Sequence, residues 1–298
     1  MTNSIYPGSD HEFGGVSTDL KLSVVEGYLH GFTTALRKHF RELWYIDAFA
    51  GTGERTVRYA AQEANLLVPA TEEKVERRRG SARIAIDVNP QFDRLIFMDE
   101  SPKHSKALSA LKGNHPTRKI DVLEGDANVA IRELIRGQSW SGTRAVMFLD
   151  PYGMSVNWDT LEAIQSTGAI DVWYLVSLSG LFRQAARNGR ALDKSKRAAL
   201  TRMLGTEEWE EAWYKRDAKL DLFGTLDDQQ SRIADVEAMD EFVGKRLKSL
   251  FPKVLKPMRL KDSRGIPQFA LYFAISNREP SAIALATKIA GHILNSGR

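Results

Sequence analysis

Apolar residues recur along this chain with two different spacings, and each spacing predicts one kind of element. Intervals of three and four predict a helix over residues 20–40, with Leu22, Val25, Leu29, Phe32, Leu36 and Phe40 on its buried face. Short continuous apolar runs predict strands at residues 43–48, 94–99, 119–123, 143–149 and 170–177. Polar segments with helical character separate these runs, for example residues 102–111 and the segment that follows Ala127 and ends at residue 136. Alternation of this kind predicts a mostly parallel sheet covered by helices.

The last third of the chain has a different pattern. Residues 183–250 read as helical throughout. Two strand-like runs, 258–260 and 267–276, then flank Asp262-Ser263-Arg264-Gly265, which is a hairpin signal. A final amphipathic helix is expected over residues 280–294. Five strand–helix units followed by an antiparallel hairpin predict an α/β, Rossmann-like methyltransferase fold. We expect a mostly parallel seven-stranded sheet with an antiparallel last strand.

One segment does not fit the regular alternation. Asp47 and Asp99 end consecutive strands of the main pattern but lie 52 residues apart, whereas a strand–helix–strand step takes roughly 30 residues. Removing the charged stretch 54–80 restores a normal spacing. The sequence therefore predicts a single domain over residues 1–298, with an inserted flap at about 54–80 and a helical insertion at about 181–250.

Bulk composition narrows the class of protein. The 298 residues are 43% hydrophobic, enough for a substantial core, and the net charge of +4 is only mildly basic. The absence of cysteine excludes disulfides, thiolate zinc sites and Fe–S clusters from this chain, and the six histidines show no metal-ligand spacing. We predict no catalytic metal. The polar first 15 residues lack a signal-peptide core, and no apolar run approaches the roughly 20 residues that span a bilayer, so we expect a soluble, cytoplasmic protein without a membrane partner.

The segment from residue 45 to 53, Tyr-Ile-Asp-Ala-Phe-Ala-Gly-Thr-Gly, carries the strongest functional signal. A buried strand ends in Asp47, and a turn with Phe49, Gly51 and Gly53 follows at once. Glycine lets the backbone approach a ligand because it has no Cβ. A buried strand with an ordinary glycine turn is the simpler interpretation. The pattern resembles the S-adenosylmethionine loop of methyltransferases that act on exocyclic amino groups of bases.

Acidic residues also follow three other predicted strands. Asp99 and Glu100 end the second strand, and Asp126-Ala127 follow the third. Carboxyl ends of parallel strands share one edge of a sheet, so these groups should meet in one crevice. With S-adenosylmethionine there, Asp99 would accept from both ribose hydroxyls and Asp126 from the adenine amino group. Taken singly, each acid could equally be an ordinary helix cap.

Asp150-Pro151-Tyr152-Gly153 follows the fourth strand and is the candidate reaction centre. Amino-methyltransferases of adenine and cytosine place Asp/Asn-Pro-Pro-aromatic at this strand end, where the acid and a backbone carbonyl orient the target nitrogen. The present motif departs from that pattern, because Tyr152 stands at the second proline position and Gly153 at the aromatic one. A strand-terminating turn is the structural alternative.

Together these motifs resemble the three-Cys-motif partner (TcmP) proteins over roughly residues 17–280. The resemblance is carried by Lys21, the glycine-turn segment, Gly80-Ser81, Phe97-Met98-Asp99-Glu100, Gly125-Asp126-Ala127 and Phe148-Leu149-Asp150-Pro151-Tyr152-Gly153. It implies a Rossmann-like relative of S-adenosylmethionine-dependent methyltransferases, with a radical-SAM-like three-cysteine protein as partner. It also implies that Lys21 reaches the cofactor's carboxylate or covers the cofactor, although a solvated lysine is an equal alternative.

A series of basic residues is the candidate nucleic-acid surface. Its members recur at intervals of three and four and would share one face of a helix: Arg183, Arg187, Arg190, Lys194 and Arg197. Such a face could track phosphates, or it could simply be a solvated surface. Three functions remain open at this point. They are a methyltransferase acting on a nucleic-acid or nucleobase-like nitrogen, a partner subunit without transfer activity, and a nucleic-acid-binding module.

Overall fold

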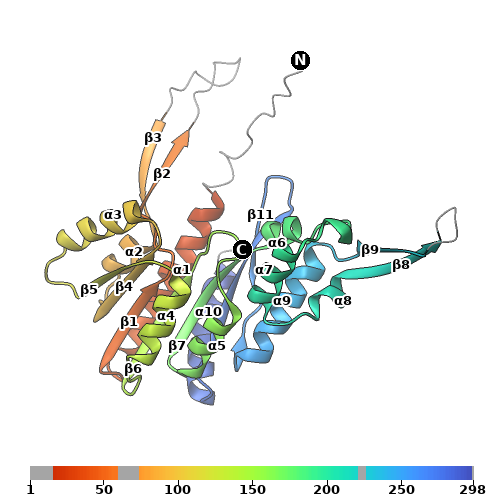
Figure 1. The fold of residues 1–298 in the computed structure, drawn as a ribbon. Coiled ribbons are helices and arrows are strands. Elements are labelled where there is room, and N and C mark those ends of the chain that lie inside the picture. Colours follow the sequence, from red (N-terminus) through yellow and green to blue (C-terminus); the bar gives the residue numbers. More distant parts are fainter. Residues whose placement is uncertain (1–15, 60–73, 221–225, 297–298) are drawn as a thin grey trace.

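The computed structural model describes residues 16–59, 74–220 and 226–296, and its centre is an eight-stranded mixed sheet (Figure 1). Five strands run parallel in the order β5-β4-β1-β6-β7. Their bounds are β1 Glu42–Asp47, β4 Arg94–Asp99, β5 Ile120–Glu124, β6 Thr143–Leu149 and β7 Ile170–Ser177. These strands match the five predicted apolar runs to within one residue at every end.

Three more strands complete the sheet through antiparallel pairings. β12 (Pro267–Ile275) pairs antiparallel with β7, and both β10 (Lys253–Val254) and β11 (Met258–Lys261) pair antiparallel with β12. The predicted antiparallel last strand and its hairpin are therefore confirmed. The sheet has one strand more than the seven predicted, because the two-residue β10 carries too few residues to leave a periodic signal. This strand order and the reversed β12 define a Rossmann-like methyltransferase fold.

Helices cover both faces of the sheet (Figure 1). One face packs against α1, α2, α3 and α10, and the other against α4 to α9. The bounds are α1 Val16–Leu36, α2 Ser81–Asp87, α3 Pro102–Gly113, α4 Ala127–Arg136, α5 Trp158–Ser166, α6 Leu178–Gln184, α7 Lys194–Leu204, α8 Trp209–Trp213, α9 Val236–Leu250 and α10 Pro280–Ser296. The central strands are buried on both faces, which explains why they are continuously apolar rather than alternating.

Two antiparallel ribbons extend away from the body on different sides (Figure 1). The first, β2 (Glu54–Tyr59) with β3 (Lys74–Arg79), forms the described part of the predicted flap, while residues 60–73 lie outside the described residues. Charged contacts hold its base to α1, because Arg55 and Arg78 both pair with Asp19. The described part of the flap is therefore a two-stranded ribbon that is anchored at its base.

The second ribbon corrects the prediction that residues 183–250 are helical throughout. β8 (Tyr214–Leu220) and β9 (Leu226–Arg232) pair antiparallel between α8 and α9. The segment contains good helix formers such as Lys215 and Ala218, but its backbone groups pair with a second strand instead. Strand formation depends on such a partner more than on the intrinsic preference of the residues. The helix prediction from local sequence was therefore wrong for this stretch.

Candidate functional site

A cleft of about 390 Å³ opens where β1, β4, β5 and β6 end. This is the edge at which ligands bind in open parallel sheets. Four of the predicted acid-bearing or glycine-bearing segments contribute to its wall. The described residues lining it are Ala48, Phe49, Asp99, Glu100, Gly125, Asp126, Ala127, Asn128, Tyr152, Ser155, Asn157 and Arg202.

The glycine turn after β1 is tied directly to the acid at the end of β4. The backbone N–H of Gly51 donates to Oδ2 of Asp99 over 2.9 Å. Gly51 and Gly53 have φ of 60° and 76°, a conformation that residues with a Cβ rarely adopt. A Cβ on Gly53 would also lie 2.9 Å from Leu111 Cδ2, whereas one on Gly51 would meet nothing within 4 Å. The turn therefore needs glycine at both positions, for its backbone path at Gly51 and for close packing at Gly53.

Asp99 is buried, and most of its acceptor capacity is already used. Oδ1 accepts from the N–H of Ser101 over 2.9 Å and lies 3.0 Å from Nδ1 of His104, while Oδ2 accepts from Gly51. A carboxylate offers about four acceptor positions, so the remaining one lies on Oδ2. This leaves room for one ligand hydroxyl rather than the predicted two. Glu100, which is exposed beside it in the cleft, can accept the second.

Asp126 is a helix cap and a cleft residue at once. Its Oδ1 accepts from the N–H groups of Asn128 (2.7 Å) and Val129 (3.3 Å), which caps the N-terminus of α4. The same residue lines the cleft together with Ala127. The helix-cap alternative is thus correct, and it holds the carboxylate at the cleft rather than excluding it from a ligand contact.

Asp47 lies behind the glycine turn and does not line the cleft among the described residues. It is fully buried, and its oxygens accept from Tyr45 Oη and from the N–H of Phe49, each over 3.3 Å. Burial is the main cause that raises the pKa of Asp47 to about 7; hydrogen bonds from Ser81, Phe49 and Tyr45 oppose the rise, and the charge of Asp150 adds to it. Its geometry is that of a group that organises the turn.

The candidate reaction centre contains an ion pair that the sequence did not indicate. α1 brings Lys21, which is only 7% exposed, to the end of β6, where its Nζ pairs with Oδ2 of Asp150. The ammonium also lies 5.7 Å from the centre of the Phe148 ring. In the structure the ion-pair partner of Lys21 is Asp150, the acid predicted to position the acceptor, and the contact of Lys21 with the cofactor stays a prediction.

Tyr152 stands at the mouth of the cleft with 69% of its surface exposed. Partial burial raises the pKa of the Tyr152 phenol, and the nearby charges of Asp99, Asp150 and Glu100 add to the rise. Its carbonyl accepts from Ser155 Oγ over 2.7 Å, which fixes the turn after Pro151. An aromatic ring is therefore presented to the cleft, although from the motif's third position rather than its fourth.

The predicted basic stripe is not a single helix face, because α6 ends at Gln184 and α7 begins only at Lys194. Arg183 lies on α6 and Arg187 between the helices, and Arg190 belongs to a 3₁₀ turn, Gly189–Ala191. Lys194 starts α7, while Arg197 is used internally in an ion pair with Glu210. These residues recur at helical intervals in the sequence, but they do not lie on one helix. Arg202, which lines the cleft, follows the stripe on α7. The sequence offered one indication of its role, namely its position on the same helix as Lys194 and Arg197.

The protein therefore belongs to the class with a Rossmann-like methyltransferase fold, and acidic residues line a crevice at the carboxyl ends of its parallel strands. No family model and no curated protein matches the chain, so the resemblance to three-Cys-motif partner proteins stays a prediction. Similar solved structures include a DUF519 protein from Legionella pneumophila, 13% identical over 93% of each chain with a TM-score of 0.45. A second is a S-adenosylmethionine-dependent methyltransferase from Clostridium acetobutylicum, 9% identical over 88% of this chain and 95% of that one, with a TM-score of 0.39.

Metal binding and membrane crossing each require a recognisable arrangement of residues. Within residues 16–59, 74–220 and 226–296, no group of three or more acidic or histidine side chains is arranged to hold a metal ion. Across the same ranges, no helix combines the length and apolarity that a bilayer crossing requires.

Proposed function

We propose that this protein is a S-adenosylmethionine-dependent methyltransferase that acts on a nitrogen of a nucleic acid or a nucleobase-like acceptor. The hydrogen bond from Gly51 N–H to Asp99 carries the proposal, because it joins the glycine turn after β1 and the acid after β4 into one cleft. A ribose-binding acid next to a close-approach turn is the arrangement that seats a nucleoside in this fold.

The residues present fit the adenosyl part of this cofactor. The cleft volume of about 390 Å³ lies within the usual range for small-molecule sites. Asp99 and Glu100 offer acceptors for the ribose hydroxyls, Asp126 offers one for the adenine amino group, and Phe49 and Ala127 supply apolar walls. When bound, S-adenosylmethionine supplies an electron-poor methyl group.

On the acceptor side, Asp150 and Tyr152 are the positioning residues. Lys21 pairs with Oδ2 of Asp150, which leaves Oδ1 to accept a hydrogen bond from a target amino group. The exposed ring of Tyr152 offers a surface against which a flat acceptor can stack. Orientation of the nitrogen is the contribution that this geometry can make to the rate.

Cofactor binding is tested by calorimetry with S-adenosylmethionine. Asp99→Ala should weaken binding by more than tenfold, and Asp99→Asn should weaken it too while keeping the fold. The matched control is Glu207→Ala, an exposed acid outside the cleft, which should bind like the wild type. Unchanged affinity in both Asp99 variants, with their thermal unfolding unaltered, would show that the cofactor site has been misplaced.

A partner subunit without transfer activity is the second candidate function, and the Lys21–Asp150 ion pair favours it. Lys21 occupies Oδ2 of Asp150, so only Oδ1 remains for an acceptor, whereas a subunit that transfers no methyl group needs neither oxygen free. Labelled S-adenosylmethionine is incubated with DNA, RNA and protein fractions, with and without a three-cysteine partner. Label transferred without the partner would eliminate this candidate. Label found only in protein would refute a nucleic-acid acceptor.

A further inference from the structure

The cleft has one positively charged wall residue among the residues that the structure describes. Arg202 comes from the last turn of α7, within the insertion predicted at about 181–250, and lines a cleft whose other charged lining residues are Asp99, Glu100 and Asp126. No element of the central sheet carries it. The insertion therefore contributes a side chain to the edge of the sheet where the adenosyl part of the cofactor is proposed to lie.

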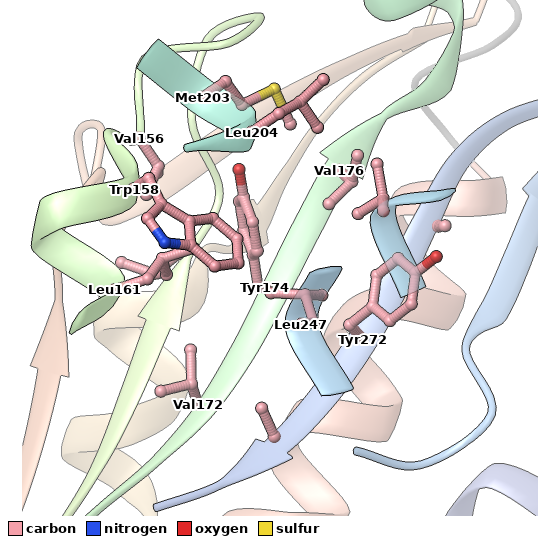
Figure 2. Close-up of a cluster of buried hydrophobic side chains, with 14 of the residues drawn as sticks. Val156, Trp158, Leu161, Val172, Tyr174, Val176, Met203, Leu204, Leu247 and Tyr272 are labelled. Atoms are coloured by element: carbon pink, nitrogen blue, oxygen red, sulfur yellow. The ribbon is translucent and has the colours of Figure 1, made fainter. Parts of the chain in front are cut away.

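The end of α7 is held firmly against the segment that lines the cleft. Met203 and Leu204 are buried beside Val156 and Trp158, as Figure 2 shows. Gly205 ends the helix with φ of 66°, so close to the Trp158 ring that a Cβ there would lie 2.1 Å from Cγ. Packing this tight fixes the backbone next to Arg202 relative to residues 155–158.

A second contact locks the same helix end. Arg246 of α9 donates from Nε to the carbonyl of Leu204 over 3.0 Å and from Nη2 to the carbonyl of Gly205 over 3.3 Å. Its guanidinium also lies 4.5 Å from the centre of the Trp158 ring. The carbonyls at the C-terminus of α7 are thus satisfied from outside the helix. Arg202 projects from a rigid frame rather than from a loop.

The guanidinium of Arg202 is not committed to another protein group in the described part of the chain. By contrast, the guanidinium of Arg197 on the same helix pairs with Glu210 and also donates to the carbonyl of Leu192. The Arg202 side chain makes no hydrogen bond or ion pair with any residue that the structure describes. An exposed cation at a cleft wall, on a rigid helix end, is available to a ligand.

We propose that Arg202 stacks its guanidinium plane on the adenine of the cofactor and so selects an adenine-bearing ligand. This inference rests on the proposed function. The charge balance favours a neutral base over a phosphate, because three carboxylates line the same cleft and would repel an anion. A planar guanidinium stacks on aromatic rings, and it is more weakly hydrated than an ammonium.

The test is calorimetry with S-adenosylhomocysteine, which cannot react, on wild type, Arg202→Ala, Arg202→Lys and Lys248→Ala. We expect Arg202→Ala to bind about five- to tenfold more weakly, and Arg202→Lys to recover little of the loss because lysine has no plane to stack. Lys248→Ala removes an exposed cation from the last turn of α9, outside the cleft, and should bind within about twofold of wild type.

Adenosine alone separates a contact to the base from a structural effect. Arg202→Ala should weaken adenosine binding, followed by ligand-observed NMR, by the same factor as S-adenosylhomocysteine, with an unchanged melting temperature. Wild-type affinity for both ligands in Arg202→Ala, with Asp99→Ala still impaired, would overturn this inference and leave the proposed function standing. Loss of single-stranded oligonucleotide binding alone would instead place Arg202 on an acceptor phosphate. Failure of the wild type to bind S-adenosylhomocysteine would remove both proposals.

Discussion

Replacing Asp47 by asparagine should change how the stability of the protein depends on pH. The substitution keeps the shape of the side chain and removes its charge. Burial raises the pKa of Asp47 to about 7 in the folded protein, whereas an aspartate in an unfolded chain has a pKa of about 3.9. Between these values the folded state holds a proton that the unfolded state has lost.

The sign and size of the effect follow from this difference. Because the unfolded state binds fewer protons over this window, the wild-type free energy of unfolding falls as pH rises. The slope is at most about 1.4 kcal/mol per pH unit, which amounts to roughly 4 kcal/mol between pH 4 and pH 7. The amide of the Asp47→Asn variant does not titrate and escapes this loss. The variant should therefore gain stability relative to wild type by up to that amount as pH rises.

Urea unfolding followed by tryptophan fluorescence at pH 4.5, 6 and 8 measures the effect. Asp171 is also buried, and burial raises its pKa to about 7, but this contribution is common to both proteins and cancels in the difference. Glu207→Gln is the control, since it removes a negative charge from the exposed surface. Parallel pH profiles for wild type and Asp47→Asn would refute the argument, because Asp47 would then be charged in both states.

Two packing predictions complete the set. Gly205→Ala should cost about 3 kcal/mol or more in urea unfolding, because its Cβ would overlap the Trp158 ring; Gly168→Ala, with a similar φ of 60° and open space, should lose only about 1 kcal/mol. If the two losses are equal, the overlap with Trp158 is not the cause. Tyr272→Phe should lower the free energy of unfolding by about 1–2 kcal/mol in thermal unfolding. It removes a buried hydroxyl that donates to the carbonyl of Asp240 over 2.7 Å and also contacts Oδ1 of Asp240. An unchanged melting temperature would contradict this.

Much of the site could be predicted because its parts are local. A buried parallel strand needs a run of apolar residues, and the acid or glycine that follows stands next to it in the chain, as at Asp99 and at Gly51. Strand ends then meet at one edge in any parallel sheet. The positions of Asp99, Asp126 and Tyr152 at the cleft followed from these rules.

Contacts between distant segments followed no such rule. Lys21 and Asp150 are 129 residues apart and meet because α1 packs across the end of β6. Asp47 belongs to a segment that resembles a cofactor-binding loop, but its side chain is fully buried, and this burial is the main cause of its raised pKa.

Local pattern along the chain was enough to specify where the parallel strands begin and end, because burial on both faces demands apolar residues at every position. It could not specify which polar side chains share a space. The basic residues at 183–197 have helical spacing, yet a break between α6 and α7 separates them. Arg202 reaches the cleft from the end of α7, where Gly205 packs on Trp158. Pairing of β8 with β9 likewise depends on hydrogen bonds to a partner strand, which no local preference encodes.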